Sequence, residues 1–336
     1  MPEFQLDVKF ECSMKGHCCK DVTATDISFP EVLRLKDELT FMPTIRSFRE
    51  ELVHQLDTPH PVTKNAFSKV IRKHCQYKDG WYYLFAWTIS KASKDPCLAL
   101  SDDNMCTIHE KRPAICAYYP LSINYPPEWL PATDTELCRN CGGLDHGPYL
   151  IKSGRLLDTS VFPAVNNARQ NIERDTLALG KGEYGQRIFH ALNFSAIETE
   201  IPLTSVPALA AALKYHKKDC DYFRNEGELE EFVDSQAKVA KRLIGKSVWC
   251  AGTVRNLFCH IALDRLVKLG LDPFQDAYLI TTNSMRKATV NQFDKPMRQL
   301  ISELKQELGE VMEWESINED AWMIPVWESG LGLEYL

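Results

Sequence analysis

Cysteines are distributed unevenly along this chain of 336 residues, and their placement constrains the protein more than any other feature of its sequence. Nine of the twelve precede residue 142, namely Cys12, Cys18, Cys19, Cys75, Cys97, Cys106, Cys116, Cys138 and Cys141. A chain of this length can bury an adequate core without disulfide bonds. In a reducing compartment, clustered cysteines indicate metal or redox chemistry rather than a disulfide framework. We therefore expect a cysteine-rich, metal-binding segment in the first part of the chain.

Composition and charge limit the partners of this protein. Hydrophobic residues make up 44% and charged residues 25% of the sequence, which is typical of a folded globular protein. The net charge of −7 offers no broad basic surface for phosphates, so no nucleic acid partner is expected. The N-terminal residues MPEFQLDVKFEC lack a basic leader, and no segment approaches ~18 uncharged apolar residues. We expect a cytoplasmic protein without a membrane partner.

The patterns of the sequence predict an α+β fold in two parts. Residues 1–147 are expected to form a small cysteine-rich domain with hairpins, and residues 148–336 a mostly α-helical domain. Glycines in CGGLDHGPYL mark the boundary between them. The helical part is predicted from apolar residues spaced by three and four. The predicted helices cover residues 206–218, 227–245, 253–270 and 295–313.

Local patterns in the first part predict its elements. FPEVLRLKDEL, residues 29–39, is expected to be an amphipathic helix capped by Asp26 or Ser28. GWYYLFAWTI, residues 80–89, is typical of a buried strand. Two short apolar runs flank the turn-forming SDDN and predict a hairpin with Cys97 on one arm and Cys106 on the other. A further hairpin is predicted in PYLIKSGRLLD, residues 148–158.

The cysteine-rich part resembles a known family. FECSMKGHCC and CLALSDDNMCTIHEKRPAICAYYP together are similar to the YkgJ-type cysteine-cluster family, a zinc- or iron-chelating domain that is distantly similar to flagellin lysine-N-methylases. The matching residues are Phe10, Cys12, Gly16, Cys18, Cys19, Cys97, Cys106, Ile108, Glu110, Arg112, Pro113, Cys116, Tyr119 and Pro120. The family signature is Cys-x-x-Cys-x-x-Cys-Cys, and Lys15 stands where its second cysteine would be. The helical part shows no such resemblance.

The resemblance implies a metal or cluster site built from the family-aligned cysteines. These are Cys12, Cys18, Cys19, Cys97, Cys106, Cys116, Cys138 and Cys141. Zinc and iron–sulfur clusters both commonly take about four thiolates, so the set could serve one site or two. Adjacent side chains in an extended segment point to opposite faces, so Cys18 and Cys19 are not expected to bind one zinc together. An iron–sulfur cluster is favoured over zinc, because the methylase relatives suggest redox-capable iron.

Several functions follow from this interpretation. The first is a metal-binding protein with an iron–sulfur cluster or zinc. The second is a protein-modifying enzyme, such as a flagellin-type lysine N-methylase with a protein substrate. The third is a structural metal site on a protein-interaction module. Cys75 is expected to be structural, Cys259 to be a small apolar core residue, and His260 to be a satisfied or exposed side chain. Cys220 and Cys250 are expected to lie outside the metal site. His109 is expected to lie beside the site rather than to bind metal.

Overall fold

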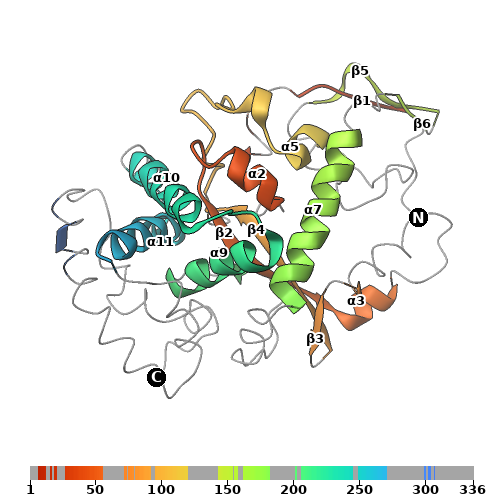
Figure 1. Ribbon diagram of the computed structural model, residues 1–336. Coiled ribbons are helices and arrows are strands. Elements are labelled where there is room, and N and C mark those ends of the chain that lie inside the picture. The colour runs from red at the N-terminus through yellow and green to blue at the C-terminus, as the bar shows by residue number, and fades with distance from the viewer. Residues whose placement is uncertain are drawn as a thin grey trace.

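The computed structural model describes residues 7–12, 16, 19–20, 27–55, 72–73, 75–78, 80–91, 95–119, 143–153, 155–157, 162–181, 201–202, 206–244, 249–270, 299, 302–303 and 306. Its strands are β1 (Val8–Phe10), β2 (Phe41–Arg49), β3 (Gln76–Lys78), β4 (Trp81–Ile89), β5 (Leu144–Lys152), β6 (Arg155–Leu156) and β7 (Ile201–Pro202). Its helices are α2 (Phe29–Arg34), α3 (Glu50–Gln55), the 3₁₀ turn η1 (His109–Lys111), α5 (Ala114–Tyr118), α7 (Phe162–Lys181), α9 (Val206–Cys220), α10 (Glu226–Ile244) and α11 (Ala251–Lys268). Figure 1 shows this mixture of helices and antiparallel strands, which is consistent with the predicted α+β class.

The larger sheet has four strands in the order β3-β4-β2-β7. β2 and β4 pair antiparallel along their whole length, from Phe41 opposite Ile89 to Arg49 opposite Trp81. The strand predicted from residues 80–89 is therefore the centre of a sheet. β7 comes from much later in the chain and adds to β2 at Thr44 and Ile45. The sheet thus joins segments from both predicted parts.

A second, three-stranded sheet has the order β1-β5-β6. Its β5–β6 hairpin turns within residues 148–158, where the sequence predicts a hairpin, and pairs Ile151 with Leu156, although β5 begins earlier, at Leu144. β1, from the N-terminus, pairs antiparallel with β5. This pairing brings the N-terminal segment to the predicted boundary near residue 147.

Helix α2 begins where the sequence predicts. Ser28 is its N-cap in a capping box with Glu31, and Pro30 occupies the first turn, where a missing N–H costs nothing. Asp26, the alternative cap, lies outside the described residues. The helix ends at Arg34, earlier than residue 39, and turns follow it.

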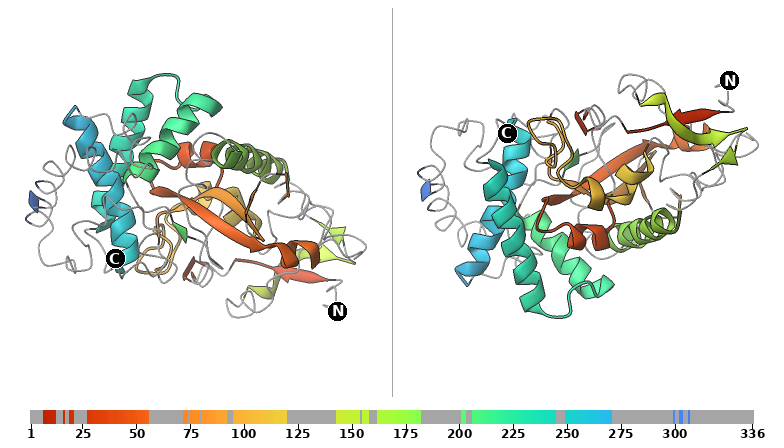
Figure 2. Two further views of the ribbon diagram at one scale, coloured as in Figure 1. Left: turned by 90° about the horizontal axis from the view of Figure 1, so that it is seen from below. Right: turned by 90° about the horizontal axis from the view of Figure 1, so that it is seen from above.

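Three of the four predicted C-terminal helices are present as α9, α10 and α11. The fourth, residues 295–313, lies almost entirely outside the described residues. Figures 1 and 2 show α10 and α11 lying side by side. No described helix is both long and apolar enough to cross a membrane.

One hydrophobic cluster contains side chains from both predicted parts. Phe29 and Trp87 come from the first part, whereas Phe232 and Leu257 come from the second, and each is at most 2% exposed. Burial on this scale is the main favourable term in folding. The division into domains at residues 1–147 and 148–336 stays a prediction.

Buried polar groups accompany this cluster. His260 lies in α11, is 2% exposed, and has its Nε2 3.1 Å from Ser90 Oγ. Burial lowers the pKa of His260 from 6.5 to about 3, because the charged ring would lack hydration in the core. Cys75 and Cys259 are buried, 5% and 1% exposed, as expected for structural residues.

We expect His260 to make the stability of the fold depend on pH. The folded pKa is below the unfolded one, so the neutral ring contributes stability above pH 6.5 that is lost as the pH falls toward about 3. The free energy of unfolding, measured by denaturant titration, should therefore decrease more steeply between these limits in the wild type than in His260→Gln. His216 is present in both proteins, so its effect cancels when the free energy of unfolding of the variant is subtracted from that of the wild type. A value of this difference that stays constant across the pH range would contradict the prediction.

Candidate metal centre

The N-terminal cysteine segment lies against the predicted hairpin. The Cys97 N–H donates to the Cys19 carbonyl oxygen at 2.7 Å, and the Lys20 N–H donates to the Gly16 carbonyl oxygen at 3.0 Å. The second bond links Lys20 to Gly16, four residues earlier in the chain. The first bond joins this segment to a residue far along the chain. Two segments of the family pattern are therefore in contact through their backbones.

Gly16 permits this close approach. Its φ is +70°, in the left-handed region that favours glycine. A Cβ at this position would lie 2.9 Å from Leu100 Cδ1 and 3.1 Å from the Asn104 carbonyl oxygen. Glycine is thus required here both by its backbone conformation and by the nearness of the hairpin.

The hairpin itself is a tight loop with one antiparallel bridge, between Leu100 and Cys106. Within the loop, the Ser101 N–H donates to the Met105 carbonyl oxygen at 2.9 Å. Asn104 adopts a φ of 61°, which asparagine tolerates better than most residues. The arms are shorter than regular strands, but they place Cys97 and Cys106 on opposite sides of the turn, as predicted.

Helix α2 holds the next cysteine in place. Glu31 Oε1 accepts a hydrogen bond from the Ala114 N–H at 2.7 Å, at the first turn of α5. Arg34 Nη1 donates to the Lys111 carbonyl oxygen at 2.6 Å. α5 is only one turn long and carries Cys116, which is exposed. Because a helix this short is marginal alone, these contacts from α2 position Cys116.

The first cysteine lies beside the small sheet. The Glu11 N–H donates to the Gly143 carbonyl oxygen at 3.1 Å. The rings of Phe10 and Tyr119, both members of the family pattern, meet edge to face with centroids 6.1 Å apart. Cys12 lies two residues after the end of β1 at Phe10. It is therefore anchored near Tyr119, the residue that follows α5.

The structure describes five of the eight predicted ligands. Cys12 and Cys116 are exposed, and Cys19, Cys97 and Cys106 are half-buried. Cys18, Cys138 and Cys141 lie outside the described residues. Among the described residues, no three of these five thiols lie within 4.8 Å of one another.

The residues beside these cysteines contact one another. His109 is partly exposed; its Nε2 contacts the Arg112 guanidinium and its Nδ1 lies 3.5 Å from Glu110 Oε1. The ring therefore lies between the two charged groups that the family pattern places near the site. Its role beside the site, rather than as a ligand, stays a prediction.

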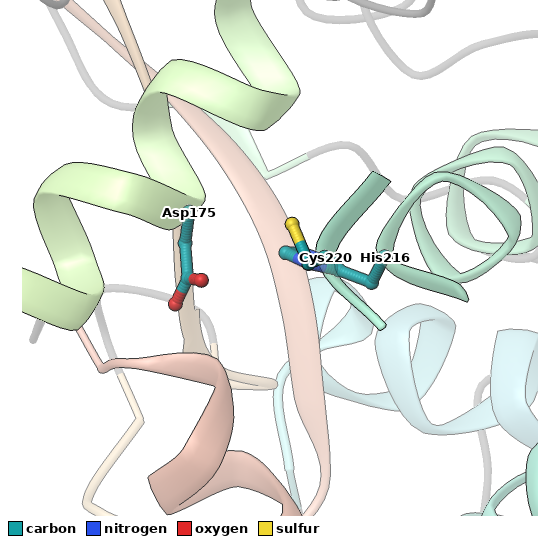
Figure 3. A group of neighbouring side chains, drawn as sticks. All are labelled: Asp175, His216 and Cys220. Atoms are coloured by element: carbon teal, nitrogen blue, oxygen red, sulfur yellow. The ribbon is translucent and has the colours of Figure 1, made fainter. Parts of the chain in front are cut away.

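A different group of potential ligands does converge. Asp175 from α7 and His216 and Cys220 from α9 each offer an atom within 4.8 Å of the others (Figure 3). We call these three residues the Asp–His–Cys group. The sequence analysis placed Cys220 outside the metal site and did not single out the other two. The i,i+4 spacing of His216 and Cys220 was the available signal, since α9 extends to Cys220, past the predicted end at residue 218, and places both on one face.

Aromatic residues surround the Asp–His–Cys group and form hydrogen bonds with some of its polar atoms. Asp175 is 2% exposed; its Oδ2 accepts the Phe29 N–H and its Oδ1 accepts the Tyr222 hydroxyl, both at 2.6 Å. Trp87 Nε1 donates to His216 Nε2 at 2.5 Å. Phe29 stacks on the imidazole with ring centroids 4.1 Å apart.

Burial controls the protonation of these groups. Desolvation raises the pKa of Asp175 from 3.8 to about 6, although the Phe29 and Tyr222 hydrogen bonds oppose the shift. Desolvation also lowers the pKa of His216 to about 3, with the Arg174 charge adding to it. The Tyr222 pKa is raised, first by burial and then by the Asp175 charge. At neutral pH the ring is neutral and the carboxyl is charged.

Substitution of Gly16 tests the contact between the N-terminal segment and the hairpin. Gly16→Ala places a side chain in the left-handed region, at a cost of about 1–2 kcal/mol, and also against Leu100 and Asn104. Gly80→Ala is the matched control, because its φ is also positive but its Cβ would meet nothing within 4 Å. We expect hydrogen exchange at the Cys97 amide to accelerate only in Gly16→Ala. Equal exchange in the two variants would contradict the docking.

Comparisons with known proteins agree with the cysteine pattern. Residues 11–142 match the model of the CxxCxxCC family, described as "Putative zinc- or iron-chelating domain". Comparison with curated proteins and with solved structures found no match. The matched region contains all eight predicted ligands and the contacts between Cys19 and Cys97. The part of the chain over residues 11–142 is thus similar to the CxxCxxCC family of zinc- or iron-chelating domains.

Proposed function

We propose that the cysteines of residues 11–142 bind an iron–sulfur cluster, with zinc as the alternative metal. The observation that carries this proposal is the hydrogen bond from the Cys97 N–H to the Cys19 carbonyl oxygen. It holds the segment with the vicinal cysteines against the hairpin with the next two. The match to the family of metal-chelating domains spans both of these segments, which supports the proposal that the contact joins parts of one site.

The donor set fits either metal. Thiolates are soft ligands that bind zinc and the irons of iron–sulfur clusters. The described part of the site supplies thiols from four segments: Cys12 after β1, Cys19, the hairpin with Cys97 and Cys106, and α5 with Cys116. The family match extends to residue 142 and so includes Cys138 and Cys141, the one Cys-x-x-Cys pair of the pattern.

The preference for a cluster over zinc rests on the resemblance to the methylase relatives, which suggests redox-capable iron. When bound, a cluster would supply one-electron redox chemistry.

Hydrogen bonds hold the backbone that carries the proposed ligands. Glu31 of α2 positions α5, and the Gly16 carbonyl oxygen accepts from Lys20, the residue after Cys19. N–H groups close to the sulfurs, and the degree of solvent exposure, set the reduction potential of a cluster. Cys116 is exposed, so this side of the site faces solvent.

Purification of the full chain without oxygen tests the metal directly. We expect iron and acid-labile sulfide together with broad visible absorption. Colourless protein with stoichiometric zinc would establish the alternative metal instead. Protein that binds neither iron nor zinc after reconstitution would refute metal binding.

Cysteine substitutions test the ligand set. We expect Cys18→Ser, Cys106→Ser and Cys116→Ser each to lower bound iron sharply, because a hydroxyl is a much poorer ligand for iron than a thiolate. Cys75→Ser and Cys259→Ser are the controls, since both residues are buried outside the family pattern. Iron per chain, measured in proteins purified in parallel, decides the outcome. Equal loss in the controls would show that instability, and not ligation, removes the metal.

Lys15 tests whether the site is complete. It stands at the second position of the family signature, where a thiol would be expected. If the natural set is complete, Lys15→Cys should leave the iron content and the visible spectrum unchanged, because Cys138 or Cys141 supplies the ligand. A changed spectrum would show that this chain has lost a ligand. The flagellin-type lysine methylase function stays a prediction, and no contact among the described residues favours it over metal binding alone.

A further inference from the structure

We propose that the Asp–His–Cys group is a second metal site, which binds a divalent ion of the zinc type between α7 and α9. It lies outside residues 11–142 and does not depend on the cysteine cluster. Asp175, His216 and Cys220 would be its protein ligands, and water would complete the coordination. Three protein ligands with one open position are common in zinc proteins.

The geometry brings the three donors to one place. His216 and Cys220 are four residues apart on α9 and extend from the same face of the helix toward α7 (Figure 3). Asp175 approaches from α7, and the three donor atoms lie within 4.8 Å of one another. Zinc bonds of ~2.0–2.3 Å bring the donor atoms closer to one another than this limit. Atoms at the limit would have to approach each other by about 1 Å. Small rotations of the side chains can supply this movement.

His216 provides an independent sign of a missing ligand. Its Nε2 accepts the Trp87 N–H, and its Nδ1 has no hydrogen-bond partner among the described residues. The ring is completely buried, where an unsatisfied polar atom is costly. A metal ion bound at Nδ1 would satisfy this atom, at the expense of the hydrogen bond that Nε2 accepts from Trp87.

The local charge favours a cation. Cys220 is the last residue of α9, at the end of the helix where the backbone carbonyls create a partial negative charge. Asp175 adds a full negative charge, and a bound metal would stabilise the Cys220 thiolate as a further one. Arg174 is the opposing cation nearby, and its guanidinium is directed to the Tyr222 hydroxyl. Two anionic ligands would match the charge of a divalent ion.

Other side chains orient the proposed ligands. The Phe29 N–H and the Tyr222 hydroxyl each hold one oxygen of Asp175. Such hydrogen bonds to a ligating carboxylate are typical of metal sites. The combination of thiolate, imidazole and carboxylate selects zinc over magnesium or calcium, which prefer oxygen ligands.

The Trp87 hydrogen bond has two consequences. It requires an unprotonated Nε2, so the neutral ring carries its hydrogen on Nδ1 and offers Cys220 no basic nitrogen. A cysteine–histidine nucleophile is therefore disfavoured. Metal binding at Nδ1 moves the ring hydrogen to Nε2 and breaks the Trp87 bond. A set of metal–ligand bonds is much stronger than one buried hydrogen bond, so the exchange favours the metal.

Zinc content and thiol protection together test this site in the full chain. After anaerobic equilibration with zinc and removal of the excess, wild-type protein should hold one more zinc ion per chain than Cys220→Ser or His216→Gln, with equal iron. Zinc should also slow alkylation of Cys220 by iodoacetamide, measured by peptide mass spectrometry, whereas magnesium should not. Cys250, which is half-buried like Cys220, is the internal control and should react equally with and without zinc.

Matched variants separate this site from the cysteine cluster and from misfolding. His260→Gln removes another completely buried histidine outside the group, and should retain both the extra zinc and the protection of Cys220. Cys106→Ser should lose metal from the cluster yet keep the zinc-dependent protection of Cys220. The proposal is overturned if the wild type gains no zinc relative to Cys220→Ser and His216→Gln, or if zinc protects Cys220 no more than magnesium does.

Discussion

The packing around Phe29 is the interaction on which the rest of this structure depends. Its ring is fully buried against Trp87 of β4 and His216 of α9, with centroids 5.1 and 4.1 Å away. Its backbone N–H donates to Asp175 of α7. One residue near the N-terminus therefore connects the central sheet with two later helices. Aromatic residues bury large areas, so this contact contributes strongly to the shared core.

Helix α2 extends this connection to the cysteine-rich region. One end of the helix carries Phe29 in the core, while Glu31 and Arg34 bind the backbone around η1 and α5. This short helix with a capping box attaches the proposed cluster site to the core, and so does the hairpin, whose Leu98, Ala99 and Ile108 belong to the hydrophobic cluster. This arrangement explains how exposed thiols can be held in position, because their backbone is anchored to buried structure. The Asp–His–Cys group instead contacts Phe29 at the start of α2, as a part of the core rather than of the cysteine segment.

Much of the secondary structure could be predicted from the sequence. The apolar spacing in α9, α10 and α11, the aromatic run of β4 and the cap at Ser28 are local signals, and the structure confirms each of them. The family of residues 11–142 was also predicted, because the cysteine order is specific. The end of α2 was not predicted, since the chain after Arg34 turns to let Lys36 and Leu39 accept hydrogen bonds from Gln236. That side chain belongs to α10, some 200 residues away.

The sequence by itself determined the strand β4, the helices α9, α10 and α11 and the cysteine pattern, because these depend on neighbours within a few positions. It also indicated metal chemistry, because thiolates at such spacings have few other uses in a reducing compartment. Only the tertiary structure decided that Cys19 meets Cys97 and that Asp175 meets His216. Contacts of this kind depend on which faces of separate elements pack together, and the periodicity of one helix says nothing about its partner. For this reason nothing in the sequence singles out Asp175. Its environment is set by the packing of α7 and α9 with the aromatic core.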